Sequence, residues 1–173
     1  MIGKNVFLRA LELSDVQTLY AFENDSTVWN ISDTVMPYSS FALEQYVLSA
    51  MESDIYSTKQ LRLVICTCCN GKAIGLVDLF DFHPKHRHAY IGMLIDSKFR
   101  QNGYASEALQ LLINYAFSTL NLHQLACNLT PDNIASIRLF EKHGFVLAGT
   151  KKEWLCINDK WTDECVYQLI KVV

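Results

Sequence analysis

The segment from Met93 to Ser106 places the strongest constraint on how this chain can fold. It reads Met-Leu-Ile-Asp-Ser-Lys-Phe-Arg-Gln-Asn-Gly-Tyr-Ala-Ser, an apolar strand pattern followed by a polar turn. Apolar residues recur at helical spacing from Ala105 to Phe117, so we expect one face of a long helix to pack on a sheet. The first turn of a helix leaves backbone N–H groups without partners, and Gly103 allows a ligand to approach them closely. The segment therefore predicts a strand–turn–helix unit that binds a phosphate or pyrophosphate.

The composition indicates one folded domain that spans residues 1–173. Half of the residues are apolar and 19% are charged, without a low-complexity segment or an internal repeat. The formal net charge of −3 argues against a broad cationic surface for nucleic acid or anionic lipid. Residues 1–10 lack the pattern of a signal peptide, and no window is apolar over the length of a membrane span. We therefore expect a cytoplasmic protein without nucleic-acid or membrane partners.

The hydrophobic periodicity predicts an α/β fold, with a mixed sheet of six or seven strands and about four helices. Asn70-Gly71, between two β-rich runs, is a strong hairpin signal. Ser14 and Gln17 have the spacing of a capping box at the start of a helix, and Gly144 is placed to end one. Gly92, inside a strand pattern, indicates a bulge or a close backbone approach. The expected strands are 6–10, 61–67, 72–82, 88–95, 123–129, 145–156 and 160–171, and the expected helices begin near residues 14, 41, 105 and 134.

The cysteines and histidines do not have the spacing of a metal site. The segment 66–69 reads Cys-Thr-Cys-Cys, which lacks the paired spacing of a zinc site. The segment 83–88 alternates histidine with Lys85 and Arg87, which favours a solvated loop. Cys127 has no histidine or lysine nearby in the sequence to lower its pKa, so we interpret it as a buried, inert thiol. We therefore expect reduced cysteines and no bound metal.

Two motifs, in this order, resemble those of the GCN5-related N-acetyltransferases. Residues 100–105, Arg-Gln-Asn-Gly-Tyr-Ala, match the family's R/Q-x-x-G-x-G/A element between a strand and a helix. Asn133, Ser136 and residues 138–145, Arg-Leu-Phe-Glu-Lys-His-Gly-Phe, resemble its second element. Within the family the chain is most similar to the spermidine and diamine acetyltransferases, and next to the ribosomal-protein N-terminal acetyltransferases. The resemblance implies a single-domain fold whose two central parallel strands splay apart.

The resemblance also implies that acetyl-CoA is the cosubstrate. The backbone of residues 93–95 would pair with the pantetheine arm as an added strand does. The turn at residues 100–106 would hold the pyrophosphate, and Asn133 would hydrogen-bond the pantetheine. Asn133 also stands where a plain helix cap is expected, and the two roles are compatible. The residues implied in cofactor binding are Met93, Leu94, Ile95, Arg100, Gln101, Asn102, Gly103, Tyr104, Ala105, Ser106, Asn133, Ser136, Phe140 and Lys142.

Acetyl transfer from a thioester requires the acceptor amine to lose a proton, because an alkyl ammonium has a pKa of about 10. The family's acid for the departing thiolate is a tyrosine, and Phe140 stands at that position here. The glutamate that the polyamine enzymes carry before the phosphate turn is replaced by Tyr90, whereas Asp78 matches an acidic position on the preceding strand. Asp78 and Tyr90 are therefore the candidate catalytic residues. The competing interpretations are an exposed strand residue for Asp78 and core packing for Tyr90.

The resemblance favours a polyamine, a diamine or another small cationic amine as the acceptor, attacked directly in a ternary complex. Glu23, Asp25, Asp33, Asp78 and Asp81 supply carboxylates that can hold such an amine. Two alternatives remain open, namely acetylation of a peptide N-terminus and a non-catalytic domain that senses acetyl-CoA. Exposed aromatic residues and the C-terminal strand also allow a homodimer or a larger homo-oligomer.

Overall fold

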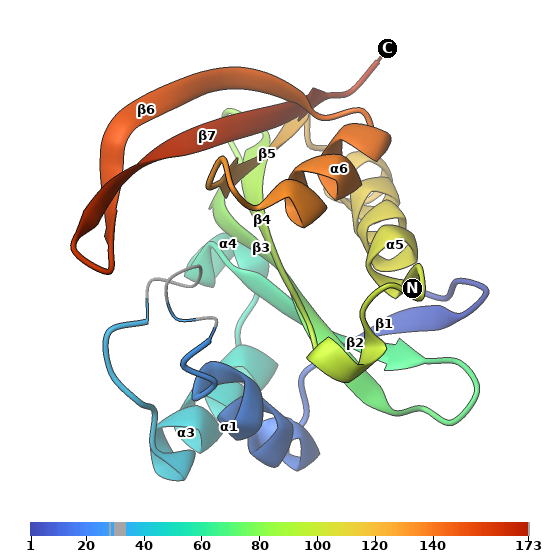
Figure 1. Ribbon diagram of the computed structural model, residues 1–173. Helices are drawn as coiled ribbons and strands as arrows, with labels where there is room; N and C mark the ends of the chain where they lie inside the picture. The colour runs from blue at the N-terminus through green and yellow to red at the C-terminus, as the bar shows by residue number, and fades with distance from the viewer. Residues whose placement is uncertain (28, 30–33, 173) are drawn as a thin grey trace.

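The seven strands found in the described residues join one mixed sheet in the order β1-β2-β3-β4-β5-β7-β6. The computed structural model describes residues 1–27, 29 and 34–172 (Figure 1). Every pair of neighbouring strands is antiparallel except β4 and β5, which run parallel. The α/β fold with a mixed sheet is therefore confirmed, with seven strands. The strands are β1 (Val6–Ala10), β2 (Leu61–Thr67), β3 (Ala73–His83), β4 (His88–Ile95), β5 (Gln124–Leu129), β6 (Val146–Ile157) and β7 (Lys160–Ile170).

Helices cover both faces of the sheet (Figure 1). The described residues form five α-helices, one more than expected because the short α4 has no clear periodicity: α1 (Val16–Glu23), α3 (Ser40–Glu52), α4 (Ile55–Thr58), α5 (Tyr104–Ser118) and α6 (Ile134–Lys142). The apolar stripe of α5 is buried in the larger core cluster with Phe140 of α6, as the helical spacing predicted. Leu19 of α1 and Leu43 of α3 belong to a second cluster with Val64 and Leu76 of the sheet. None of the helices in the described part of the chain is long and apolar enough to cross a membrane.

The hairpin of β2 and β3 turns at Asn70-Gly71, as expected from the sequence. Gly71 has a φ of 68°, which a glycine adopts without steric cost. The Asn70 Oδ1 accepts a hydrogen bond from the Thr67 hydroxyl at 2.6 Å, which closes the turn. A bulge between Ile65 and Cys66 shifts the register by one residue, and with this shift Arg62 lies directly opposite Asp78.

The start of the first helical segment differs from the sequence prediction. The capping box is formed by Glu12 and Asp15 around a 3-10 turn (Leu13–Asp15), and not by Ser14 and Gln17. Asp15 is 4% exposed, and its oxygens accept hydrogen bonds from Arg9 Nη1 at 2.6 Å and Nη2 at 2.7 Å. Arg9 of β1 stabilises the capping box that contains Asp15, because it pairs with the Asp15 carboxylate. The local spacing of a capping box does not reveal this distant partner.

We predict that Arg9→Gln lowers the free energy of unfolding by about 2 kcal/mol at pH 7, because it leaves a buried carboxylate without its cation. Burial would raise the pKa of Asp15, but hydrogen bonds from Arg9 and the Glu12 N–H outweigh it and hold the pKa below its usual range. This stability is present above the unfolded pKa of about 3.9 and is lost as the pH falls through the lower folded value. The difference in unfolding free energy between the parent and Arg9→Gln, measured by denaturant unfolding, should therefore become smaller below about pH 4.

Lys152→Gln is the matched control, because Lys152 is an exposed cation that pairs with Asp163 at 2.7 Å. We expect no measurable change in stability from it, since an exposed ion pair contributes little. If the loss of unfolding free energy in Arg9→Gln stays constant from pH 7 to pH 3, the charge of Asp15 is not its cause.

Candidate functional site

The sheet opens in its middle, between β4 and β5. These strands pair only from His88 to Tyr90 on β4 and from Gln124 to Ala126 on β5. Beyond Tyr90, β4 continues to Ile95 while paired with β3 on its other edge. Within the described residues, no strand covers the β5-facing edge of that segment. The splay of the two central parallel strands is therefore confirmed, and it exposes a strand edge that an extended ligand can pair with.

Gly92 lies on the splayed part of β4, in regular register opposite Asp78. A Cβ at this position would meet the Phe80 ring at 3.5 Å and Asp78 Oδ2 at 3.8 Å. These are ordinary van der Waals contacts with side chains, so within the described residues neither a bulge nor a close backbone approach is found at Gly92, and the irregularity of this hairpin lies between Phe80 and His83.

The turn after β4 presents a row of free N–H groups. The first helical hydrogen bond runs from Glu107 N to Gly103 O at 3.1 Å. The N–H groups of residues 101–106 have no acceptor within the described part of the chain. Gly103, the N-terminal cap of α5, has a φ of 79°, and Gln101 has one of 62°. The strand–turn–helix unit is therefore present, and N–H groups placed in this way suit an anion, although the binding of one here stays a prediction.

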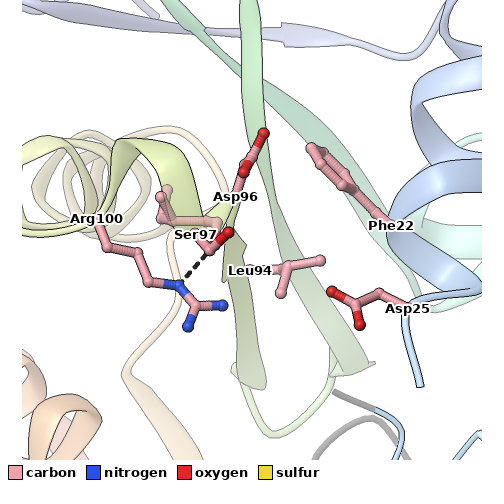
Figure 2. Close-up of a pocket in the computed structure, with 7 residues that line it drawn as sticks. Phe22, Asp25, Leu94, Asp96, Ser97 and Arg100 are labelled. Carbon is pink, nitrogen blue, oxygen red and sulfur yellow. Dashed lines mark hydrogen bonds between the residues drawn. The ribbon is translucent and has the colours of Figure 1, made fainter. Parts of the chain in front are cut away.

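Arg100 lies at the mouth of the splay. Its Nε donates to the Ile95 carbonyl at 3.0 Å, which directs the guanidinium away from the helix. Figure 2 shows Arg100 and Asp25 on opposite sides of Leu94, with Phe22 of α1 on the same side as Asp25. These residues line a small pocket of about 50 Å³. Hydrogen bonds from Thr27, and to a smaller degree the charge of Arg100, lower the pKa of Asp25.

Helix α6 supplies the residues of the second motif. The Asn133 side chain caps the helix, because its Oδ1 accepts from the Ser136 N–H at 3.2 Å. Phe140 is 4% exposed, and its ring meets Phe145 edge-on with centroids 5.0 Å apart. Lys142 is exposed. The cap of Asn133 is thus shown, while its binding role stays a prediction.

Asp78 is held in an ion-pair network on the face of the sheet that α1 and α3 cover. Both of its oxygens accept from Arg62, at 2.7 Å from Nε and 3.1 Å from Nη2. The third nitrogen, Nη1, donates to Glu23 Oε1 at 2.6 Å, and the guanidinium lies 5.4 Å from the centroid of the Tyr46 ring. Burial alone would lower the pKa of Arg62, but Asp78, Tyr46 and Glu23 raise it overall. The network contains two carboxylates and one cation, so it has one excess negative charge.

Tyr90 lies where β4 leaves β5. Its ring stacks on Phe80 with centroids 5.7 Å apart, which is the packing role weighed from the sequence. It also lines a cavity of about 230 Å³ with Ala126, Val166 and Gln168. That cavity opens at the apex of the splay. The catalytic roles of Asp78 and Tyr90 both remain predictions.

The other candidate groups lie apart from this arrangement. Asp81 is exposed at the irregular end of β3, and Asp33 lies outside the described residues. Burial raises the pKa of the Cys127 thiol to about 12, which agrees with an inert cysteine. His83 stacks on His86 in the exposed β3–β4 loop. Across the described residues, no cluster of three or more His, Cys, Asp or Glu side chains is arranged to hold a metal ion.

Arg62 was not predicted from the sequence as a site residue. The sequence signal was incomplete, because Arg62 lies eight residues before Asn70 and Asp78 seven after Gly71, and only the bulge between Ile65 and Cys66 brings them opposite each other. Glu23 could not be joined to this pair from the sequence, because the contact depends on how α1 packs on the sheet.

The chain matches the acetyltransferase (GNAT) domain model over residues 5–146. A probable N-acetyltransferase of Bacillus subtilis, YjcK, is 25% identical over 97% of this chain and 95% of its own. The spermidine N(1)-acetyltransferase of Vibrio cholerae is 28% identical over 94% of this chain and 91% of its own.

Among solved structures, the spermidine N-acetyltransferase from Vibrio cholerae in complex with CoA and spermine superimposes with a TM-score of 0.85. It is 25% identical to this chain, and the match covers 95% of both chains. The splayed strands, the free N–H groups before α5 and the family match agree: the chain belongs to the GNAT acetyltransferases, which transfer acetyl groups from acetyl-CoA.

Proposed function

We propose that this protein acetylates a primary amine of a small cationic molecule, a polyamine or diamine, by direct attack in a ternary complex with acetyl-CoA. The excess negative charge of the Glu23–Arg62–Asp78 network is the observation that carries the choice of acceptor. Asp25, near the splay, adds a second negative group on the side of α1. The similarity to spermidine acetyltransferases supports the same class of acceptor.

The described residues fit acetyl-CoA. The open edge of β4 at Met93, Leu94 and Ile95 offers backbone groups to the pantetheine amides, in the manner of an added strand. The N–H groups of residues 101–106 suit the pyrophosphate, and Arg100 adds a positive charge at the mouth of the splay. Bound in this way, acetyl-CoA supplies a thioester carbonyl for the amine to attack. On the α6 side, Asn133 and Ser136 would contact the pantetheine arm.

The acceptor ammonium must lose a proton before its nitrogen can attack. Both oxygens of Asp78 already accept from Arg62, so in this proposal Asp78 orients the amine and takes its proton through water. The Tyr90 hydroxyl, at the apex of the splay, is the second group placed for such a relay. The nitrogen then bonds to the carbonyl carbon as the C–S bond breaks, and the sulfur leaves as a thiolate.

The long β6–β7 hairpin supports the expectation of a homo-oligomer. Leu147, Trp154 and Trp161 are each more than half exposed on it. Exposed apolar side chains in this number favour contact with another protein surface, and a second copy of this chain is the partner we propose.

Gly103→Ala tests the proposed pyrophosphate site. Gly103 and Gly71 both have positive φ, and a Cβ would meet nothing within 4 Å at either position. The two alanine variants should therefore lose similar stability, about 1 kcal/mol. Only Gly103→Ala distorts the N–H turn, so we expect it to raise the KM for acetyl-CoA about tenfold. Steady-state kinetics with both variants checks this, and an unchanged KM in Gly103→Ala would exclude the turn as the binding site.

Glu23→Gln tests the acceptor. The amide oxygen of the introduced glutamine would still accept a hydrogen bond from Arg62, but the network would become neutral, so we expect the KM for spermidine to rise about fivefold to tenfold. Glu52→Gln, at the exposed end of α3, is the control and should leave the KM unchanged. The panel includes spermidine, spermine, a diamine and short peptides. Turnover of peptide N-termini without turnover of polyamines would overturn the proposal, and tight acetyl-CoA binding without any turnover would indicate a sensor.

Phe140→Tyr tests whether the missing acid limits the rate. A hydroxyl at this position can protonate the departing thiolate, so we expect kcat to rise about threefold to tenfold. Phe117→Tyr, on α5, is the control for an added hydroxyl on the core side of a helix. Release of the CoA thiol measures the rate, and thermal unfolding separates any loss of stability. A stable Phe140→Tyr protein with an unchanged kcat would show that protonation of sulfur does not limit turnover.

A further inference from the structure

A second polar network joins the phosphate turn to the end of α6. Ser106 Oγ, in the first turn of α5, lies 2.9 Å from Nε2 of His143, the residue that caps α6. The other ring nitrogen of His143, Nδ1, lies 3.1 Å from Gln110 Oε1, one helical turn further along α5. Neither His143 nor Gln110 takes part in the proposed acetyl transfer.

The network fixes which nitrogen of neutral His143 carries the proton. Gln110 Nε2 donates to Asn114 Oδ1 at 2.9 Å, so the amide presents its oxygen to the histidine. Nδ1 must then be the donor, and Nε2 is left as an acceptor. In this state the Ser106 hydroxyl must donate to His143, and its proton cannot point elsewhere.

Protonation of His143 reverses this arrangement. With protons on both nitrogens, Nε2–H donates to Ser106 Oγ, and the serine proton becomes free for another acceptor. A change of tautomer alone does not achieve this, because the Gln110 amide and its partner Asn114 would both have to turn over. The charge on His143 therefore sets the direction of the Ser106 hydroxyl.

The hydroxyl stands beside the anion site. Ser106 is the last residue of the row whose backbone N–H groups have no acceptor in the described part of the chain. We propose that His143 is a positioning residue of the cofactor site: once charged, it turns the Ser106 hydroxyl toward the pyrophosphate, so acetyl-CoA binding takes up a proton at His143. This inference rests on the pyrophosphate placement proposed above.

The surroundings keep His143 neutral until an anion arrives. Burial, and then the charge of Lys142, hold the pKa of His143 below its usual range. The side chains that α5 presents to it, Ser106 and Gln110, are uncharged. The nearby carboxylate of Glu107 is turned to the other side of α5, where it accepts from the Asn5 N–H at 2.8 Å. A bound pyrophosphate is then the main source of negative charge for a charged His143.

The arrangement does not support a nucleophilic serine. In a serine–histidine–carboxylate triad the third group is negatively charged and stabilises the histidine cation. Here that position holds the neutral Gln110 amide. His143 therefore gains its charge when a ligand brings an anion, and Ser106 acts as a hydrogen-bond donor to that ligand.

The test measures proton uptake when CoA binds to the full chain. Calorimetry at pH 7 in two buffers of different ionisation enthalpy gives the number of protons taken up by the parent, His143→Gln, Ser106→Ala and the double variant. His123→Gln, which replaces an exposed histidine beyond the C-terminal end of α5, is the control. CoA alone is the probe, so the titration of its own phosphate is common to all five proteins and cancels in the differences.

We expect the parent and His123→Gln to take up more protons than His143→Gln and Ser106→Ala. If binding raises the pKa of His143 by about one unit, CoA affinity should gain up to about tenfold between pH 8.5 and pH 6 relative to His143→Gln. The double variant should bind no more weakly than the weaker single variant, because the two side chains act as one unit. In the parent, the ¹⁵N shifts of His143 should report a higher pKa with CoA than without it.

Equal proton uptake by the parent and His143→Gln would overturn the inference. A Ser106→Ala variant that keeps the full pH dependence would do the same. The Gly103→Ala variant separates this failure from a failure of the proposed site. If Gly103→Ala weakens CoA binding while His143→Gln takes up as many protons as the parent, the pyrophosphate placement holds and only the role of His143 is lost.

Discussion

The short parallel pairing of β4 with β5 is the constraint on which the rest of the structure depends. Each of these strands is paired along most of its length with an antiparallel neighbour, β4 with β3 and β5 with β7. Each half of the sheet is therefore hydrogen-bonded within itself, and the two halves meet over three residue pairs. Helix α5 is the crossover between the two parallel strands, and its apolar stripe belongs to the common core. The gap follows from this one departure from regular pairing, whereas the N–H turn before α5 and the cap of α6 arise from local turn and helix signals.

In the proposed function, the cofactor is bound mainly by backbone groups and the acceptor by side chains. This difference determines how well each binding site could be predicted from the sequence. The proposed cofactor contacts are mostly backbone groups, whose positions follow from a strand, a turn with Gly103 at positive φ and a helix start. Such local patterns are visible in a sequence. The acceptor side depends on side chains that meet only after α1 packs on the sheet. Glu23 and Arg62 are 39 positions apart and share no local pattern, so their contact was not foreseen.

The distinction between local patterns and contacts of distant residues also explains which other predictions from the sequence were right or wrong. The Asn70-Gly71 hairpin and the buried face of α5 were predictable, because turn chemistry and helical periodicity act over a few residues. The capping box was placed at Ser14, because two overlapping segments have suitable spacing and only the distant Arg9 selects Asp15. The contact of His143 with Ser106 likewise exists only because α5 and α6 lie side by side (Figure 1). Local sequence patterns thus predict the helices, strands and turns. Where two local patterns are equally suitable, a charge pair with a distant residue determines which one forms.

Phe140 stands where the family has a tyrosine acid, and this difference indicates which catalytic group the site can lack. A departing thiol has a pKa of about 8.5, so it can leave as a thiolate near neutral pH at modest cost. An alkyl ammonium has a pKa of about 10 and cannot attack until it loses its proton. The loss of an acid for sulfur is therefore tolerable, whereas the loss of every route for the amine proton is not. Phe140 now packs against Phe145 in the core, while the network of Glu23, Arg62 and Asp78 keeps a negative charge on the acceptor side. In the proposed reaction, catalysis in this chain therefore depends more on removing the amine proton than on protonating the sulfur.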